Sequence, residues 1–194
     1  MSEIDYRKLW VVIPVVILNI LALLLVQDPW LLGISGEAVF QQKEYYRLAS
    51  GMFLHAGIVH LCTNMIMLTA TAYVFTEFHS AWSFYIVYLL SGLLGGLLMA
   101  GIRFLLKSPV ITVGASGACM GILGADLATI FKNRSWMSKS SKFNYLRGLL
   151  ILSLVNLIPK ESGVDYLGHL CGFMIGFLLI LIFTKKGEPR TLTL

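Results

Sequence analysis

Residues 166–184 read YLGHLCGFMIGFLLILIFT, an apolar run that contains no Asp, Glu, Lys or Arg. A helix of roughly 20 apolar residues crosses the hydrocarbon core of a bilayer, so this run predicts a membrane-spanning helix. Within it, Gly168, Gly172 and Gly176 recur at a spacing of four residues. Small residues at that spacing let two membrane helices approach closely. The sequence therefore predicts a helix that packs tightly against a neighbour.

Apolar runs of the same kind occur along the rest of the chain. They predict helices over about 9–26, 50–76, 81–102, 116–131 and 145–158, of which the last is the shortest. Charged residues make up only 13% of the 194 positions and hydrophobic residues 57%, whereas about a quarter of a soluble domain is charged. We therefore predict an all-α fold, a polytopic bundle of six transmembrane helices in a single membrane domain covering residues 1–194.

The positive residues predict the orientation of this bundle. Five of the 15 Lys and Arg residues fall on one side of the membrane, namely Lys43, Arg47, Arg103, Lys107 and Lys160. The other ten fall on the opposite side, which the positive-inside rule assigns to the cytoplasm together with both termini. Because these residues flank apolar runs, the net charge of +5 does not indicate nucleic-acid binding. The long connection 27–47 is either an interfacial segment or a solvated loop.

A few polar residues interrupt the apolar runs, where each is costly and is by default a functional hypothesis. The second run contains His60 and Asn64, the fourth begins at Ser116, and the sixth contains His169. The second, fourth and sixth helices cross the membrane in the same direction in this topology. His60, Ser116 and His169 are therefore expected at a similar depth, near the outer face.

Ser116 lies in the sequence Gly114-Ala115-Ser116-Gly117, at the start of an apolar helix. A helix N-terminus offers free N–H groups and the positive end of a dipole, which suit a developing oxyanion. Gly114 and Gly117 would let a substrate backbone approach. This pattern favours a nucleophilic serine, and the alternative is a serine that only caps the helix.

His169 follows Gly168 near the start of the last apolar run. Imidazole is the usual general base for a serine nucleophile. The alternative is a core histidine hydrogen-bonded to a neighbouring helix. Gly168 and Gly172 favour the catalytic interpretation, because they would bring the two helix backbones close enough for a serine–imidazole contact.

His60 and Asn64 are four residues apart and so share one face of a helix. Both can donate hydrogen bonds, and together with the Ser116 amide they could form an oxyanion hole. The alternative is that they only bind neighbouring helices. His55, which we place nearer the surface, is assigned a structural role.

The acids and cysteines near these residues suggest other chemistry, which we consider less favourable. Asp126 lies ten residues after Ser116, roughly 15 Å deeper along a straight helix, so we predict a Ser–His dyad and a structural role for Asp126. The repeated pairs His60–Cys62 and His169–Cys171 could suggest zinc. Residues two apart point to nearly opposite faces of a helix, however. We therefore expect no metal and no other cofactor.

The ordered set of motifs resembles the rhomboid family of intramembrane serine proteases. The matching elements are Tyr46-Arg47, His55-x4-His60-x3-Asn64, Gly114-Ala115-Ser116-Gly117 and Gly168-His169 with Gly172 and Gly176. The resemblance implies a six-helix bundle of the minimal prokaryotic type, with a water-filled cavity that opens to the outer face of a cell membrane. It implies a serine endopeptidase that cleaves within or beside the transmembrane helices of other membrane proteins. Tyr46 departs from the family pattern, in which Trp is usual.

In this resemblance Ser116 is the nucleophile and His169 the general base, and His60, Asn64 and the Ser116 amide form the oxyanion hole. The expected partners are transmembrane protein substrates and the lipid bilayer. Two other functions remain open at this stage. One is a non-catalytic relative that binds membrane helices, and the other is a small channel or transporter lined by the same polar residues.

Overall fold

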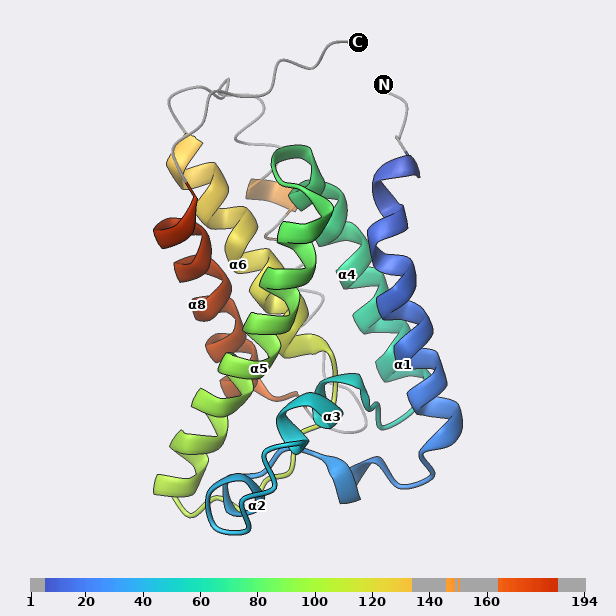
Figure 1. Ribbon diagram of the computed structural model, residues 1–194, viewed down its shortest axis with the longest axis vertical. Coiled ribbons are helices and arrows are strands. Elements are labelled where there is room, and N and C mark those ends of the chain that lie inside the picture. The colour runs from blue at the N-terminus through green and yellow to red at the C-terminus, as the bar shows by residue number, and fades with distance from the viewer. Residues whose placement is uncertain (1–5, 134–145, 149, 151–163, 185–194) are drawn as a thin grey trace.

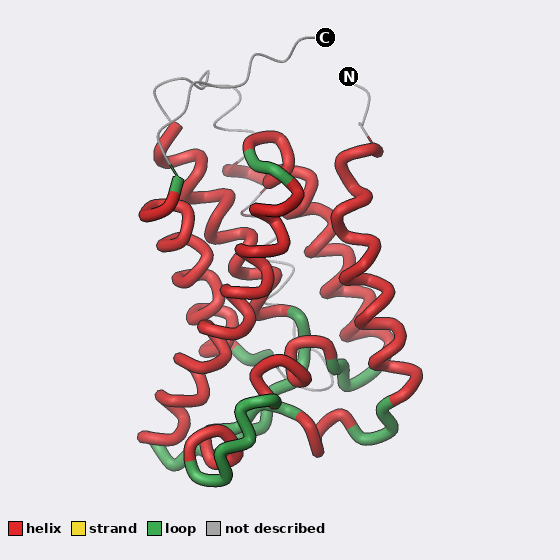
Figure 2. Tube along the Cα trace, in the orientation of Figure 1, coloured by secondary structure: helices red, strands yellow, loops and turns green. Residues whose placement is uncertain are grey.

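The computed structural model describes residues 6–133, 146–148, 150 and 164–184, and it is helical almost throughout this part (Figures 1 and 2). The elements are η1 (Tyr6–Val12), α1 (Ile13–Leu25), η2 (Pro29–Leu32), α2 (Gly36–Phe40), α3 (Arg47–Phe53), α4 (Ile58–Phe78), α5 (Ala81–Leu105), α6 (Ser116–Asn133) and α8 (Tyr166–Phe183). The only β pairing among the described residues is a bridge between Ile34 and Thr112.

The long helices have the character of membrane spans. By length and composition α4, α5 and α8 can each cross a bilayer, and residues Leu9–Leu25 form a shorter apolar helical segment. Helix α6 differs, because most of its residues are buried by its neighbours. Together these elements form the predicted polytopic, all-α membrane bundle.

Helix α6 lies at the centre of the bundle and packs against α4, α5 and α8. Its contact with α8 is a direct contact between the backbones of the two helices. A Cβ atom added to Gly172 would stand 2.0 Å from the Gly117 carbonyl oxygen, and one added to Gly176 would stand 1.9 Å from the Gly121 oxygen. These approaches are too close for any side chain, so the glycines allow α6 and α8 to touch directly.

The second predicted helix is not continuous, so the prediction of a single helix over 50–76 is wrong. Helix α3 ends at Phe53 and α4 begins at Ile58, with an irregular connection between them. Hydrophobicity alone does not distinguish one straight helix from two helices joined by a turn. The connection contains His55, which turns into the protein and is 2% exposed.

The other boundaries differ less from those expected. The first helix includes a 3₁₀ segment and ends at Leu25, the third continues to Leu105, the fourth to Asn133, and the last ends at Phe183. The fifth predicted helix, 145–158, lies outside the described residues except for 146–148 and 150.

The short elements η2, α2 and α3 lie across one end of the bundle, opposite the start of η1 and the end of α8 (Figure 1). Gly36 of α2 packs against α5, since a Cβ there would stand 2.5 Å from the Phe104 nitrogen. The segment also exposes large apolar side chains, including Leu31 and Tyr45. This combination favours the interfacial interpretation of connection 27–47 over a solvated loop.

Candidate active site

Ser116 is the first residue of α6. Its side chain is largely buried, with 7% of the residue exposed. The preceding loop is anchored to α3 by a hydrogen bond from the Gly114 N–H to the Gly51 carbonyl, at 2.9 Å. The serine is therefore held at a helix N-terminus by a loop that is itself fixed to the fold.

Gly114 adopts a conformation that suits only glycine. Its φ angle is +129°, and a Cβ there would stand 2.9 Å from the His60 Nε2 atom and 3.5 Å from Asn64 Nδ2. L-residues rarely adopt such a φ, and the space is filled by the two side chains of α4. His60 and Asn64 thus both reach the backbone two residues before Ser116.

His55 supports this arrangement from the connection between α3 and α4. Its Nε2 atom lies 2.9 Å from the Asn64 amide nitrogen and 3.5 Å from the Ala115 amide nitrogen. Its ring packs edge-on against His60, with centroids 4.9 Å apart. His55 therefore orients Asn64 and His60, which the sequence interpretation did not foresee beyond a general structural role.

His169 lies in the first turn of α8 and is 7% exposed. The backbone N–H of His169 donates to the Asp165 carbonyl at 3.0 Å. The Asp165 side chain caps the helix by accepting from the backbone N–H of Gly168 at 2.9 Å. Gly168 leaves room for this cap, since a Cβ there would stand 2.7 Å from Asp165 Oδ2. The local sequence thus starts α8 one turn before the histidine.

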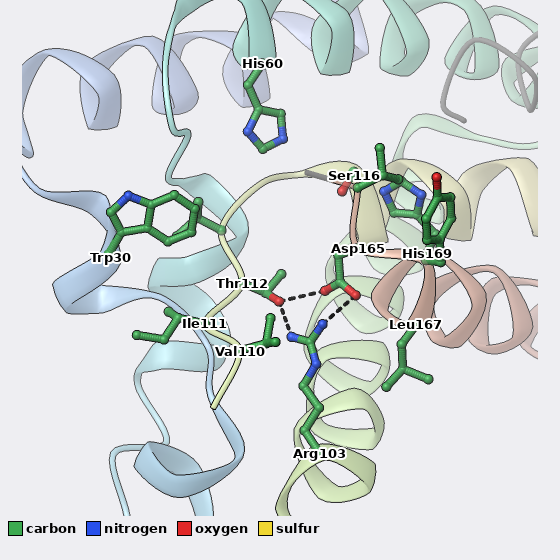
Figure 3. Close-up of a pocket in the computed structure, with 13 residues that line it drawn as sticks. Trp30, His60, Arg103, Val110, Ile111, Thr112, Ser116, Asp165, Leu167 and His169 are labelled. Carbon is green, nitrogen blue, oxygen red and sulfur yellow. Dashed lines mark hydrogen bonds and ion pairs between the residues drawn. The ribbon is translucent and has the colours of Figure 1, made fainter. Parts of the chain in front are cut away.

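Ser116 and His169 line one cavity of about 420 Å³ and lie side by side on its wall (Figure 3). His60 lines it as well, whereas Asn64 lies behind Gly114 and is fully buried. The remaining lining residues are Trp30, Arg103, Val110, Ile111, Thr112, Val113, Val164, Asp165, Tyr166 and Leu167. The structure therefore gathers the predicted polar residues of three helices around one mixed polar and apolar cavity.

One polar network in this cavity was missed by the sequence interpretation. Arg103 Nη2 pairs with Asp165 Oδ1 at 2.7 Å, Thr112 donates to Asp165 Oδ2 at 2.6 Å, and Arg103 Nη1 donates to Thr112 Oγ1 (Figure 3). The available signal was an Arg ending one apolar run and an Asp preceding another, both on the predicted outer side. Opposite charges at the same depth are expected to pair.

Asp126 does not line the cavity. It is 1% exposed in α6, and neither carboxylate oxygen has a hydrogen-bond partner among the described residues. Its structural role therefore stays a prediction. The described residues also contain no group of three or more His, Cys, Asp or Glu side chains that could hold a metal ion.

Comparison with known proteins identifies the family. The family model of the Rhomboid domain matches residues 42–186, a range that contains every residue of the candidate site except Trp30. The chain belongs to the rhomboid family. It is an integral membrane protein. The family includes proteins named as proteases.

Individual relatives agree with this membership. RHOMBOID-like protein 6, mitochondrial, of Arabidopsis thaliana is 37% identical over 157 residues, which cover 80% of this chain and 49% of the relative. Rhomboid-like protease 3 of Toxoplasma gondii is 28% identical over 95% of this chain and 72% of the relative. Rhomboid protease GluP of Bacillus subtilis is 29% identical over 75% of this chain and 27% of the relative.

The chain spans about half the length of the plant relative that it matches. The Rhomboid match includes α3, α4, α5, α6 and α8. Two of these relatives, those of Toxoplasma gondii and Bacillus subtilis, are named as proteases.

Proposed function

We propose that this chain is an intramembrane serine endopeptidase that uses a Ser116–His169 dyad to cleave transmembrane or membrane-proximal segments of other membrane proteins. The observation that carries the proposal is the crossing of α6 and α8 at Gly117 and Gly172. This backbone contact lies one residue after Ser116 and three after His169. It supports the proposal because it holds close together the two helices that carry Ser116 and His169, which line one cavity.

The first chemical step follows from this arrangement. His169 accepts the Ser116 proton while Ser116 Oγ attacks the carbonyl carbon of the scissile peptide bond. The resulting imidazolium then donates its proton to the leaving amine as the tetrahedral intermediate collapses to an acyl-enzyme. A water molecule, deprotonated by His169, hydrolyses the ester and restores the serine.

The oxyanion of the tetrahedral intermediate needs donors beside Ser116. The N–H of Ser116 at the start of α6 is one candidate, favoured by the helix dipole. Asn64 and His60 are the others, since both side chains adjoin Gly114. An amide nitrogen carries two N–H donors, so Asn64 can bond His55 with one and the oxyanion with the other.

The substrate class follows from the cavity walls and the membrane setting. Apolar residues, including Trp30, Val110 and Ile111, border the polar centre. A substrate segment that leaves its helical conformation could bury apolar side chains there while presenting an extended backbone to Ser116. The proposed partners are therefore transmembrane proteins within the lipid bilayer.

The location proposed for this site is the outer face of a cell membrane, with both termini in the cytoplasm. The positive residues support this orientation. The start of η1 and the end of α8 lie at the same end of the bundle, opposite the short helices, as the proposal requires (Figure 1). A prokaryotic cell membrane is the proposed setting.

A fluorophosphonate probe tests the proposed function in purified, detergent-solubilised protein. We expect the parent to be labelled and both Ser116→Ala and His169→Ala to lose labelling. Ser108→Ala is the matched control, because Ser108 lies in the loop just before Ser116 but outside the cavity lining. Labelling of the parent and Ser116→Ala to the same extent would favour a non-catalytic binding or transport function instead.

A further inference from the structure

We infer that Asp165, Thr112 and Arg103 form a positioning clamp that sets the alignment of Ser116 with His169. The inference rests on the proposed function, because the alignment matters only if the two residues react together. The clamp residues touch neither reacting atom in this mechanism. They act through the backbone segments that carry the nucleophile and the base.

The position of the clamp along the chain is the first argument. Thr112 lies four residues before Ser116, and Asp165 lies four residues before His169. The Thr112 hydroxyl donates to Asp165 Oδ2 at 2.6 Å. One hydrogen bond therefore joins the two catalytic segments, at equivalent positions upstream of each catalytic residue.

Thr112 and Asp165 are each held in place by backbone hydrogen bonds on their own side of the clamp. The N–H and C=O groups of Thr112 both pair with Ile34, at 2.8 Å each, which holds the loop before Ser116 against the segment following η2. Asp165 Oδ1 caps α8 at Gly168, and the Asp165 carbonyl accepts from the His169 N–H. A shift of either segment would therefore be transmitted to a catalytic residue.

Arg103 adds a charge from the end of α5. It pairs with Asp165 at 2.7 Å and also donates to Thr112, so the guanidinium bridges the other two members. The side chains of Arg103 and Asp165 are only 9% and 15% exposed. In a partly dry site the loss of one partner leaves an uncompensated charge, which displaces the groups around it.

The carboxylate is already used by Arg103, Thr112 and the Gly168 amide. Asp165 therefore acts as a positioning residue and not as the acid of a catalytic triad. This distinction predicts which substitutions matter. Asn caps helices as well as Asp does, so Asp165→Asn can keep the cap with its one oxygen. It removes the charge, the ion pair with Arg103 and the second oxygen, which accepts from Thr112.

Four variants test the clamp in the intact chain: Asp165→Asn, Thr112→Val, Thr112→Ser and Lys107→Gln. The readouts are the fluorophosphonate labelling rate, kcat and KM on a transmembrane peptide, and the thermal unfolding midpoint in one detergent. We expect Asp165→Asn and Thr112→Val to lower the labelling rate and kcat by about 10²-fold, the effect of roughly 1 Å of misplacement. KM should change little. The unfolding midpoint should fall in Asp165→Asn, which leaves the Arg103 charge unpaired, and fall less in Thr112→Val, so the rates are measured well below both midpoints.

Thr112→Ser retains the hydroxyl and should retain most of the labelling rate and kcat. Comparison with Thr112→Val therefore distinguishes the effect of the hydrogen bond from the effect of side-chain shape. Lys107→Gln removes an exposed cation near Arg103 and should behave as the parent. Parent-like labelling and kcat in both Thr112→Val and Asp165→Asn would overturn the clamp and leave the proposed function intact. So would a rate loss that only parallels a fall in the unfolding midpoint.

Amide hydrogen exchange gives a readout that does not depend on activity. In Asp165→Asn and Thr112→Val the first turn of α8 should exchange faster, while α4 and α5 exchange as in the parent. If the parent itself fails to label, the proposed function fails. Unchanged exchange in the first turn of α8 would overturn the clamp in either case.

Discussion

The carbonyl oxygen of Gly117 occupies the space that any side chain at Gly172 would need, 2.0 Å from the position of a Cβ. The two helices that carry Ser116 and His169 therefore meet backbone to backbone next to both residues. The geometry of the proposed dyad therefore depends on this contact as well as on the hydrogen bond between Thr112 and Asp165.

Gly172→Ala should separate α6 from α8 and lower both stability and activity. Overpacking of this kind costs about 1–3 kcal/mol, and the separation moves His169 away from Ser116. Thermal unfolding and fluorophosphonate labelling measure the two effects. The matched control is Gly101→Ala in α5, where an added Cβ makes only an ordinary contact of 3.5 Å with Phe40. A Gly172→Ala variant with parent stability and rate would contradict this packing.

Gly114→Ala should reduce the rate through two separate causes. The φ of +129° strains any L-residue by about 1–3 kcal/mol, and the added methyl group would displace His60. Labelling rates in the single variant and in Gly114→Ala with His60→Ala distinguish them. We expect the double variant to recover only the stability lost to the contact with His60, because the strained φ remains, and not to recover the rate, because it lacks the His60 donor. Recovery of the full rate would remove His60 from the oxyanion hole.

Asn64→Ala should lower kcat by on the order of 10²–10³-fold if its amide donates to the oxyanion. The assay is peptide cleavage well below the unfolding temperature, because Asn64 is fully buried and its loss also destabilises the fold. Asn19→Ala is the control, since Asn19 is an equally buried amide that donates to the Val15 carbonyl and does not line the cavity. Retention of kcat in Asn64→Ala would show that the other donors suffice.

His55→Ala should act through Asn64. The 2.9 Å contact between the His55 ring and the Asn64 amide orients that amide, and a buried hydrogen bond contributes about 1 kcal/mol, so we expect a rate loss of about 5- to 10-fold. A double-mutant cycle is the decisive measurement. His55→Ala should cost less in an Asn64→Ala background than in the parent, because coupled residues are not additive, and the remaining cost reports the contacts of His55 with His60 and Ala115. Additive losses would indicate that His55 acts independently.

Several elements of the site were predictable because they depend on local patterns. Apolar length and low charge predicted the membrane bundle, and the Gly168, Gly172 and Gly176 spacing pointed to a close helix approach. The cost of polar groups in a bilayer drew attention to His60, Ser116 and His169, which line one cavity. The catalytic roles of these residues remain predictions.

The break between α3 and α4 was not predictable, because residues 50–76 are apolar whether the chain runs straight or turns. The turn places His55 behind Asn64, nine residues apart in sequence, and no helical spacing predicts that contact. The Arg103–Asp165 pair was missed for a similar reason. The two residues are 62 positions apart, and each alone resembles an ordinary charged residue at a membrane boundary.

The sequence by itself determined that the chain is a membrane helix bundle of the rhomboid type, and which few polar residues the bundle would contain. Those properties follow from hydrophobic length, charge placement and residue spacing, which act along a single helix. Only the tertiary structure decided that Asn64 lies behind Gly114 and that Thr112 bonds Asp165. Such contacts depend on how helices cross, and the crossings are determined by backbone approaches, such as that of Gly117 to Gly172, between segments distant in sequence.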